Sequence, residues 1–406
     1  MTKRIYKYFT CANSSVGFVS FFEQNLDGLE NIYILKGGPG TGKSTMMKKI
    51  GDYFLSQGEN IDHIYCSSDS NSLDGIIINN RKTAVVDGTS PHVIEPKAPG
   101  AVEEYINLGK AWDRNKLKQH KSEILDIKQQ ISKLYNGIYS NLSKAKTVHD
   151  DWEKIYLDNI DYNSLDSAAI ELCNKIVDSE KSNDNGKIID RFFGALTPNG
   201  SVNYIENLTS DLSKRYFIKG RPGTGKSTIM KKIANLAKNN GYKTEVYHCS
   251  FDPDSLDMVI IRDLDVCIFD STSPHELFPS RTSDEIVDLY QTAVKPGTDE
   301  ENSARLSAIQ NRYDKLNSQA RCFLSNIHTL HDELESIYIN AMNFDVINSI
   351  TSELNQPDST ENSPITIPAI TLSGVLSIVG VFMAASLRPS IESSSKRNCQ
   401  ISGIFT

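Results

Sequence analysis

The sequence predicts an α/β protein made of two tandem, doubly wound domains, each bearing a long helical arm. The pattern Gly-x-x-x-x-Gly-Lys-Ser occurs twice, at 37–44 and at 220–227. Its lysines, Lys43 and Lys226, are 183 positions apart (226 − 43). The same interval separates further pairs of identical residues: Cys66 and Cys249, Leu73 and Leu256, Asp74 and Asp257, Asp87 and Asp270, Pro91 and Pro274, and His92 and His275. A regular apolar periodicity late in each half indicates that the helical arm belongs to the repeated unit.

Each copy of the pattern is typical of a phosphate-binding loop, the Walker A motif. Its glycines allow a tight strand-to-helix turn whose backbone N–H groups point at phosphates, and the helix N-terminus adds a favourable dipole. Lys43 and Lys226 would neutralise the β and γ phosphates, and Ser44 and Ser227 would offer a hydroxyl to Mg²⁺. The candidate nucleotide-binding residues are Gly37, Gly38, Pro39, Gly40, Thr41, Gly42, Lys43, Ser44 and Thr45, and Gly220, Arg221, Pro222, Gly223, Thr224, Gly225, Lys226, Ser227 and Thr228.

The residues around both loops fit this interpretation. Residues 32–35 (Ile-Tyr-Ile-Leu) predict a buried strand before the first loop, and residues 45–55 predict a helix after it. Residues 216–218 (Tyr-Phe-Ile) predict the corresponding strand of the second copy. A strand before the loop and a helix after it are the context in which this pattern binds phosphate. Each half is therefore expected to contain a doubly wound P-loop domain.

A second carboxylate that holds Mg²⁺ is expected at the end of an apolar strand. The apolar runs 84–86 and 267–269 end in Asp87 and Asp270, and a small residue and Thr-Ser-Pro-His follow each. An apolar run that ends in Asp is a weak signal by itself, but it recurs at the same distance from both loops. The predicted metal ligands are Ser44, Asp87, Ser227 and Asp270.

A water-activating glutamate is absent from the position after these aspartates, where Gly88 and Ser271 stand. The shared pattern Cys-Ser-x-Asp-x-x-Ser-Leu-Asp follows the second predicted strand of each copy, where a doubly wound sheet opens on its ligand. Asp69 and Asp252 in this pattern are candidates to orient a water or to accept a proton. The candidate catalytic residues are therefore Lys43, Lys226, Asp69 and Asp252. The alternative is that both aspartates form Asx turns or helix caps.

With these motifs in place, the chain resembles a family of bacterial tandem P-loop proteins that are described as ATPases or as nucleotide-kinase-like proteins. The shared features are Leu-Lys-Gly-Gly-Pro-Gly-Thr-Gly-Lys-Ser-Thr, the cysteine-serine-aspartate pattern and Val-Asp-Gly-Thr-Ser-Pro-His. The resemblance covers about residues 5–355 and implies ATP binding at Lys43 and Lys226, but no particular substrate. The chain departs from the family at Arg221, which stands in the place of Gly38, and in the tail after about residue 357.

Composition sets the domain organisation and excludes some partners. The chain has 406 residues, enough for two domains, which we expect at 1–178 and 188–356, with a tail at 357–406. Seven irregularly spaced cysteines form no disulfide pattern, as in a cytoplasmic protein. The net charge of −8 argues against a broad nucleic-acid surface.

The helical arms are expected at about 108–157 and 302–342. Apolar residues at alternating spacings of three and four indicate a coiled-coil seam on each arm. In the first arm they are Ile124, Ile127, Ile131, Leu134 and Ile138, and in the second Leu306, Ile309, Tyr313, Leu316, Ala320, Phe323, Ile327, Leu330, Leu334 and Ile337. Here the offset between copies is 182, as between His149 and His331. The arms either pack within the molecule or form hairpins that dock a protein partner.

The tail contains 23 uncharged residues at 365–387, long enough to span a bilayer. Pro368 and two glycines weaken a helix there, and Arg388, Lys396 and Arg397 would follow it on the wrong side of a membrane. We therefore expect a cytoplasmic protein, with membrane association through 365–387 as the alternative.

The function favoured by the sequence is ATP binding and Mg²⁺-dependent hydrolysis at two sites in one chain. The absence of a guanine-reading Asn/Thr-Lys-x-Asp pattern favours adenine. One alternative is a kinase that phosphorylates a small hydroxyl substrate, suggested by the short interval from Lys43 to Asp87 and by Asp69. Another is a nucleotide-gated binding scaffold with little turnover.

Overall fold

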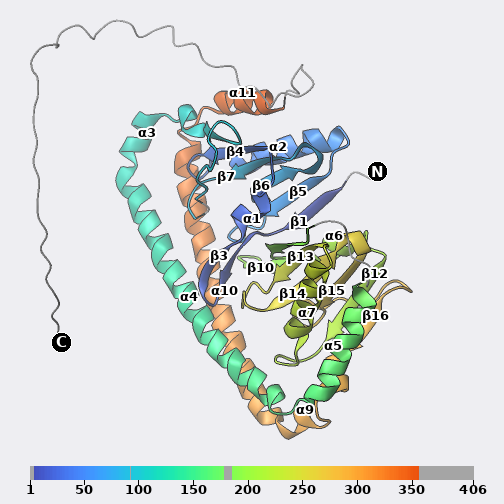
Figure 1. The fold of residues 1–406 in the computed structure, drawn as a ribbon. Helices are drawn as coiled ribbons and strands as arrows, with labels where there is room; N and C mark the ends of the chain where they lie inside the picture. The colour runs from blue at the N-terminus through green and yellow to red at the C-terminus, as the bar shows by residue number, and fades with distance from the viewer. Residues whose placement is uncertain (1–3, 92, 178–184, 356–406) are drawn as a thin grey trace, which may run out of the picture. The chain divides into compact units, whose positions relative to one another are not determined.

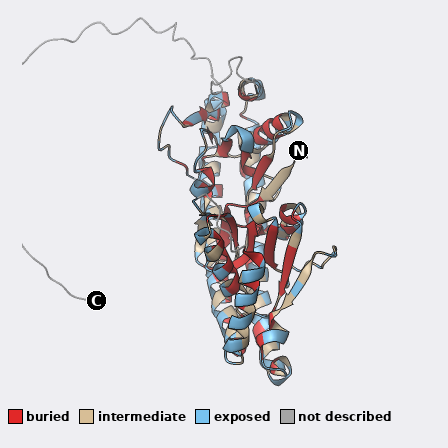
Figure 2. Ribbon diagram, turned by 45° about the vertical axis from the view of Figure 1, so that its right-hand side comes forward, coloured by how far each residue is buried: buried red, intermediate tan, exposed pale blue. Residues whose placement is uncertain are grey.

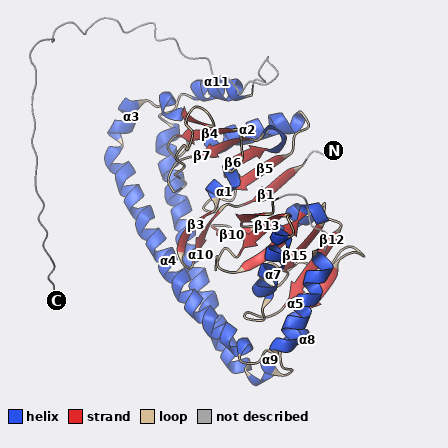
Figure 3. Ribbon diagram, viewed as in Figure 1, coloured by secondary structure: helices blue, strands red, loops and turns tan. Residues whose placement is uncertain are grey.

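Two six-stranded mixed sheets organise the chain (Figures 1 and 3). The structure is a computed structural model that describes residues 4–91, 93–177 and 185–355. These residues belong to one compact unit. Burial is concentrated in the strands (Figure 2). The α/β class expected from the sequence is therefore confirmed.

Both sheets have the same spatial order of strands. The first sheet runs β1 (Ile5–Tyr8), β5 (Ile61–Tyr65), β6 (Leu73–Ile78), β7 (Thr83–Asp87), β4 (Asn31–Lys36) and β8 (Glu103–Asn107). The second runs β9 (Lys187–Arg191), β13 (Lys243–His248), β14 (Leu256–Ile261), β15 (Val266–Asp270), β12 (Lys214–Lys219) and β16 (Glu285–Asp288). Two hairpins are separate: β2 (Cys11–Ser14) with β3 (Gly17–Ser20), and β10 (Gly194–Thr197) with β11 (Gly200–Asn203).

One strand of each sheet, β6 or β14, runs antiparallel to both of its neighbours. The sheets are therefore mixed, which is a departure from the parallel arrangement usual for a doubly wound domain. The cause is the length of the connections. Residues 66–72 join β5 to β6 and residues 79–82 join β6 to β7, whereas a parallel crossover needs about a dozen residues or more. The cysteine-serine-aspartate pattern is thus a hairpin connection.

The helices occupy corresponding places in the two halves. In the first half they are α1 (Phe22–Leu26), α2 (Lys43–Ser56), α3 (Arg114–Gln119), α4 (Lys121–Leu157) and α5 (Tyr162–Ile176). In the second they are α6 (Ile205–Thr209), α7 (Lys226–Asn239), α8 (Leu289–Ala293), α9 (Thr298–Glu301), α10 (Ser303–Ile339) and α11 (Phe344–Leu354). Short 3₁₀ helices are η1 (Asn79–Arg81), η2 (Leu108–Ala111) and η3 (Arg262–Leu264).

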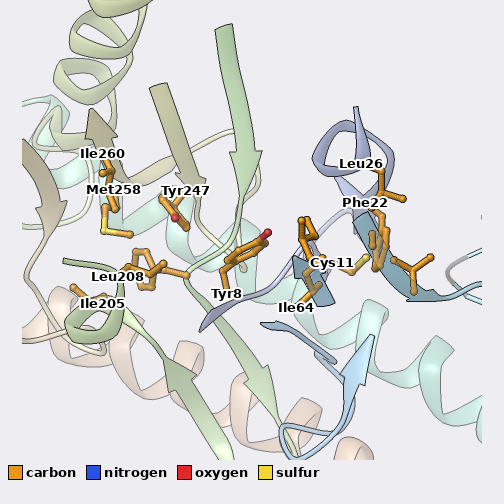
Figure 4. Packing of buried hydrophobic residues seen from close by; sticks show 14 of the residues in the cluster. Tyr8, Cys11, Phe22, Leu26, Ile64, Ile205, Leu208, Tyr247, Met258 and Ile260 are labelled. Carbon is orange, nitrogen blue, oxygen red and sulfur yellow. The ribbon is translucent and has the colours of Figure 1, made fainter. Parts of the chain in front are cut away.

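A large hydrophobic cluster joins the two sheets (Figure 4). From the first half it contains Tyr8, Phe22 and Ile64, and from the second Tyr247 and Met258, all at most 2 % exposed. Burial of this apolar surface is the main favourable term in folding. The two halves therefore share a core, and a further cluster packs α5 and α7 on the second sheet.

Backbone and side-chain contacts cross between the halves in a reciprocal way. Phe9 and Phe192 exchange two N–H···O=C bonds of 2.8 Å each. Asn25, in α1, donates its amide to the carbonyl of Asp190, in β9, at 2.9 Å. Asn207, in α6, donates its amide to the carbonyl of Ile5, in β1, at 3.0 Å. Each short helix thus donates a hydrogen bond to the edge strand of the other half.

A buried group of charged side chains lies at the same junction. The Arg191 guanidinium lies 4.0 Å from the centre of the Tyr8 ring, 3.6 Å from Asp62 and 3.5 Å from Glu245. Arg262 donates to Glu245 at 2.7 Å. Although burial opposes ionisation, Arg262 and Arg191 lower the pKa of Glu245 to about 2. Because each buried charge has an opposite partner, the junction tolerates charge that would otherwise be costly.

The helices α4 and α10, of 37 residues each, lie side by side (Figure 1). Ile138 and Leu142 of α4 pack with Leu324 of α10, whereas Ile155, further along α4, packs with Ile309, earlier on α10. The two helices are therefore antiparallel. The arms expected from the apolar periodicity pack against each other in this structure.

The end of each arm packs on the other half. α5 contacts α7 and α8, and α11 contacts α2 and η2. Backbone bonds fix this exchange: Asp161 N–H donates to the Ala293 carbonyl at 2.7 Å, and Asp113 N–H donates to the Ala341 carbonyl at 2.7 Å. Residues 162–176, assigned to the first domain from their place in the chain, thus cover the second sheet.

Among the described residues, no helix is long and apolar enough to cross a membrane. The segment 365–387, the candidate for a membrane span, lies outside them.

Leu324→Ala should destabilise the protein strongly. Leu324 is fully buried between α4 and α10, and truncating a buried leucine costs about 2–5 kcal/mol in free energy of unfolding. Leu125→Ala, on the same helix pair but at a residue that is 55 % exposed, is the matched control and should cost less than about 0.5 kcal/mol. Urea unfolding measures both, and equal losses would contradict the packing described.

Stability should also fall as the pH drops from about 6.5 to 4. Burial lowers the pKa of His63 to about 4 in the folded state. In the unfolded chain the same imidazole has its ordinary pKa of 6.5, so the unfolded chain binds the proton more readily. The resulting loss is roughly 2–3 kcal/mol, complete only below the folded-state pKa. His63→Gln should flatten unfolding free energy against pH in this window. His120→Gln, at an exposed histidine, should leave the slope as it is.

Candidate functional site

Each glycine-rich loop lies between an interior strand, next to the edge strand of its sheet, and the N-terminus of a helix. The first connects β4 to α2 and the second connects β12 to α7. Gly42 and Gly225 directly precede these helices with φ of 80° and 89°, a backbone conformation that glycine adopts without steric cost. The strands and helices predicted around both loops are present. The loop N–H groups are thus gathered at a helix N-terminus, where an anion is stabilised.

The loop lysines occupy the same position in both halves. The Lys43 ammonium donates to the carbonyls of Gly37 at 3.2 Å and Gly38 at 2.8 Å, and the Lys226 ammonium donates to those of Gly220 at 3.2 Å and Arg221 at 2.9 Å. Both lysine side chains are nearly buried, at 11 % and 12 % exposed. Each positive charge is therefore held inside its loop.

The predicted metal ligands lie next to these lysines. Lys43 Nζ is 3.5 Å from Asp87 Oδ2, and Lys226 Nζ is 3.5 Å from Asp270 Oδ2. The reason is parallel pairing, because Asp87 is in register with Leu35 at the end of β4. Thr89 N–H donates to Asp87 at 2.8 Å, which orients the carboxylate. Separate segments of the chain thus converge at the carboxyl ends of the parallel strands in each sheet.

The serine hydroxyls complete this donor set. Ser44 Oγ accepts a hydrogen bond from Leu73 N–H at 3.0 Å, and Ser227 Oγ accepts one from Leu256 N–H at 2.9 Å. These bonds fix the hydroxyls against the β6 and β14 strands. A hydroxyl and a carboxylate oxygen at the end of a strand are hard ligands of the kind that Mg²⁺ prefers. The residues present therefore fit a magnesium ion.

A second carboxylate, Asp257, lies close to Asp270 in the second half. Burial and the charge of Asp270 hold the pKa of Asp257 above its usual range. His275 Nε2 is 3.8 Å from Asp257 Oδ2, and burial lowers the pKa of His275. Burial in this part of the second site therefore favours the uncharged forms of Asp257 and His275. His92, the counterpart of His275, lies outside the described residues.

The proposed catalytic aspartates are engaged in turns. Asp69 accepts hydrogen bonds from Asn71 N–H at 3.0 Å and from the Ser72 hydroxyl at 2.5 Å. Asp252 accepts one from the Ser255 hydroxyl at 3.3 Å and lies 3.5 Å from Lys146 Nζ. Asp69 thus has the contact of an Asx turn, whereas Asp252 accepts a bond from a side-chain hydroxyl of its turn. Both aspartates take part in the turns that the sequence offered as the alternative to a chemical role.

The arm of each half lies on the loop of the other half, which local sequence reasoning did not reveal. A methyl group at Gly40 would lie 2.9 Å from the carbonyl oxygen of Glu335, in α10, and one at Gly223 would lie 2.7 Å from that of Glu153, in α4. Gly40 and Gly223 also have positive φ, 65° and 77°. Glycine is thus required at both positions by conformation and by close approach.

The next residues of the arms cover the beginnings of the loops. The Tyr338 ring lies 2.8 Å from where a methyl group at Gly38 would stand. In the other site, Tyr156 donates its hydroxyl to Asp299 at 2.8 Å, and Arg221 donates to the same carboxylate at 2.8 Å. Arg221, the departure from Gly38, is therefore turned outward into an ion pair and leaves the loop geometry unchanged.

A repeated sequence pattern marks the arm surfaces that contact the loops. It is His-Asp-x-x-Glu-x-Ile-Tyr, at 149–156 and at 331–338. Its histidine, glutamate and tyrosine are spaced by four and three positions, so they share one face of a helix. These polar residues interrupt the apolar seam of the arms, and this interruption was the signal in the sequence that the arms do more than pack against each other.

The electrostatics of this surface depend on burial. Burial raises the pKa of Glu153 and lowers that of His149, and the charges of Lys146, Asp252 and Lys226 act on both groups. His149 Nδ1 is 3.7 Å from Glu153 Oε1, and the corresponding distance from His331 to Glu335 is also 3.7 Å. The same pair of side chains is therefore spaced alike in both arms.

Comparisons of the chain with family models, curated proteins and solved structures found no match. The function is therefore inferred from the residues and distances of the two loops.

Gly40→Ala should loosen the arm, whereas Gly58→Ala should not. Both glycines have positive φ, so either alanine costs roughly 1 kcal/mol in backbone strain. Only at Gly40 would the new methyl group meet the α10 backbone, because nothing lies within 4 Å of one at Gly58. Hydrogen exchange at the amides of 335–339 should accelerate in Gly40→Ala alone. Equal protection in the two variants would contradict the close approach.

Proposed function

We propose that the chain is a tandem duplication of a P-loop NTPase domain that binds ATP at both loops and hydrolyses it with Mg²⁺. The observation that carries the proposal is the recurrence of one arrangement at two places far apart in the chain. In each, a loop lysine lies 3.5 Å from an aspartate at a strand end and the following serine hydroxyl is fixed by a backbone N–H. A structural ion pair would not need the glycine loop, the helix N-terminus and the serine around it.

The residues suggest how the phosphates would be held. The loop N–H groups and the dipole of α2 or α7 would bind the phosphate oxygens, with the ammonium of Lys43 or Lys226 among them. These positive groups are held in place before the reaction, which is the most effective way to stabilise charge that develops in a transition state. Ser44 with Asp87, and Ser227 with Asp270, would hold Mg²⁺. When bound, the ion would neutralise charge on the β and γ phosphates.

The two sites are proposed to be active together. Neither lacks a motif residue, and the lysine, aspartate and serine contacts agree within 0.1 Å between them. Arg221 is the main difference, and its guanidinium is bound to Asp299 outside the loop. Two working sites in one chain would allow the nucleotide at one to influence the helices that cover the other.

Lys43→Ala and Lys226→Ala should each remove one site. In the full-length protein with ATP and Mg²⁺, we expect each single variant to keep about half of the phosphate release. The double variant should fall by at least about 100-fold, the scale seen when a preorganised charge-stabilising group is lost. ADP and phosphate are measured together, so that transfer to another molecule is distinguished from hydrolysis.

Lys49→Ala is the matched control, because Lys49 is an exposed residue of the same helix as Lys43. It should leave phosphate release unchanged. Full activity in the double variant would rule out the loops as the sites of hydrolysis. Binding of ATP by the native protein without any release would favour a nucleotide-gated scaffold.

A further inference from the structure

The residues after the metal-binding aspartates offer no proton acceptor for the water that hydrolysis requires. Gly88 and Ser271 follow the metal-binding aspartates, and neither has a group that accepts a proton readily. Asp69 accepts hydrogen bonds from an N–H and a hydroxyl of its turn, and Asp252 accepts one from a hydroxyl. A hydrolase built on this plan needs another carboxylate or imidazole near the loop.

The backbone of each arm approaches the opposite loop at a glutamate. Glu153 of α4 lies against the second loop: a methyl group at Gly223 would stand 2.7 Å from its carbonyl oxygen and 3.1 Å from its Cβ. Glu335 of α10 has the same relation to the first loop, with its carbonyl oxygen 2.9 Å and its Cα 3.3 Å from a methyl group at Gly40. The two glutamates are thus placed alike, on opposite halves.

The surroundings of Glu153 suit a group that gains and loses a proton. Burial raises its pKa, and Lys146 and Lys226 oppose that rise. Its Oε1 is 3.7 Å from the ring of His149, whose own pKa is lowered by burial, which favours a neutral imidazole. A carboxylate with a raised pKa, near enough to the loop lysine Lys226 to be affected by its charge, is a better proton acceptor than a solvated one.

We propose that each arm supplies the water-activating carboxylate of the opposite site: Glu153 serves the loop at 220–227, and Glu335 serves the loop at 37–44. This inference rests on the proposed hydrolysis. In the step, the water oxygen forms a bond to the γ phosphorus, and the bond from that phosphorus to the β–γ bridging oxygen breaks. The water proton passes to the glutamate and then to solvent. The products are ADP, phosphate and a proton.

The exchange makes both reactions depend on one helix pair. Glu153 and Glu335 reach their loops only while α4 and α10 are packed side by side, because each arm begins in one half and ends on the other. A movement of the helix pair would therefore alter the two sites together. Hydrolysis would then be linked to the shape of the arms and not only to the loops.

A crossover experiment tests the assignment in the full-length protein. The variant K43A leaves only the loop at 220–227 able to work, so adding E153Q should lower phosphate release by at least about 100-fold. In K226A, where only the loop at 37–44 works, adding E335Q should cause the same loss. The mismatched pairs, K226A/E153Q and K43A/E335Q, should release phosphate at the rate of their single lysine variants.

Two readouts separate a chemical role from a structural one. Glutamine keeps the size of glutamate, so E153Q and E335Q should bind ATP within about threefold of the native affinity and unfold at the native temperature. Asp151→Asn and Glu333→Gln, at exposed positions of the same two helices, are controls that should leave the rate unchanged. A parallel loss of ATP affinity and of rate in E153Q would overturn the inference.

The remaining outcomes distinguish this inference from the function on which it rests. Losses in the mismatched pairs instead of the matched ones would mean that each glutamate serves its own half. Full activity of all four pairs relative to their lysine variants would mean that another group accepts the proton. If the native protein releases no phosphate, the hydrolase proposal fails, and the trans-acting glutamates fail with it.

Discussion

The antiparallel packing of α4 against α10 is the contact on which the rest of the molecule depends. Each helix has 37 residues and so extends about 55 Å, far enough to begin on one sheet and end at the loop of the other. Neither helix can bury its apolar stripe alone, and a helix of this composition gains most of its stability from tertiary packing. Pairing the arms therefore also determines which loop each arm covers.

The junction between the sheets reinforces the same exchange. The two sheets share one hydrophobic cluster, and α1 and α6 each contact the edge strand of the other half. Arg191 links Asp62 to Glu245 across this junction. Separating the halves would expose the common core and leave buried charges without partners, which is costly. The shared core and ion pairs hold the two halves together, so a response to nucleotide would pass through the arms.

Much of the candidate site could be predicted because its geometry is local. A phosphate loop consists of consecutive residues, so the spacing of Gly37, Lys43 and Ser44 specifies it directly. Asp87 could be predicted too, because an apolar strand that ends in Asp pairs in parallel with the strand before the loop. The sequence placed Asp69 where a doubly wound sheet opens on its ligand, whereas the short connection after β5 produces a hairpin, in which Asp69 accepts a hydrogen bond from Ser72.

The sequence by itself determined the α/β class, the two glycine-rich loops, the strand-end aspartates and the long helical arms, because each depends on residues near one another in the chain or on a repeated period. Only the tertiary structure decided that β6 and β14 are antiparallel, that the halves share a core, and that Glu153 and Glu335 lie on the loops of opposite halves. Glu153 and Gly223 are 70 positions apart (223 − 153). Their contact follows from the direction in which two long helices pack. The apolar spacing in the sequence does not specify that direction, because the spacing is the same whichever partner buries it.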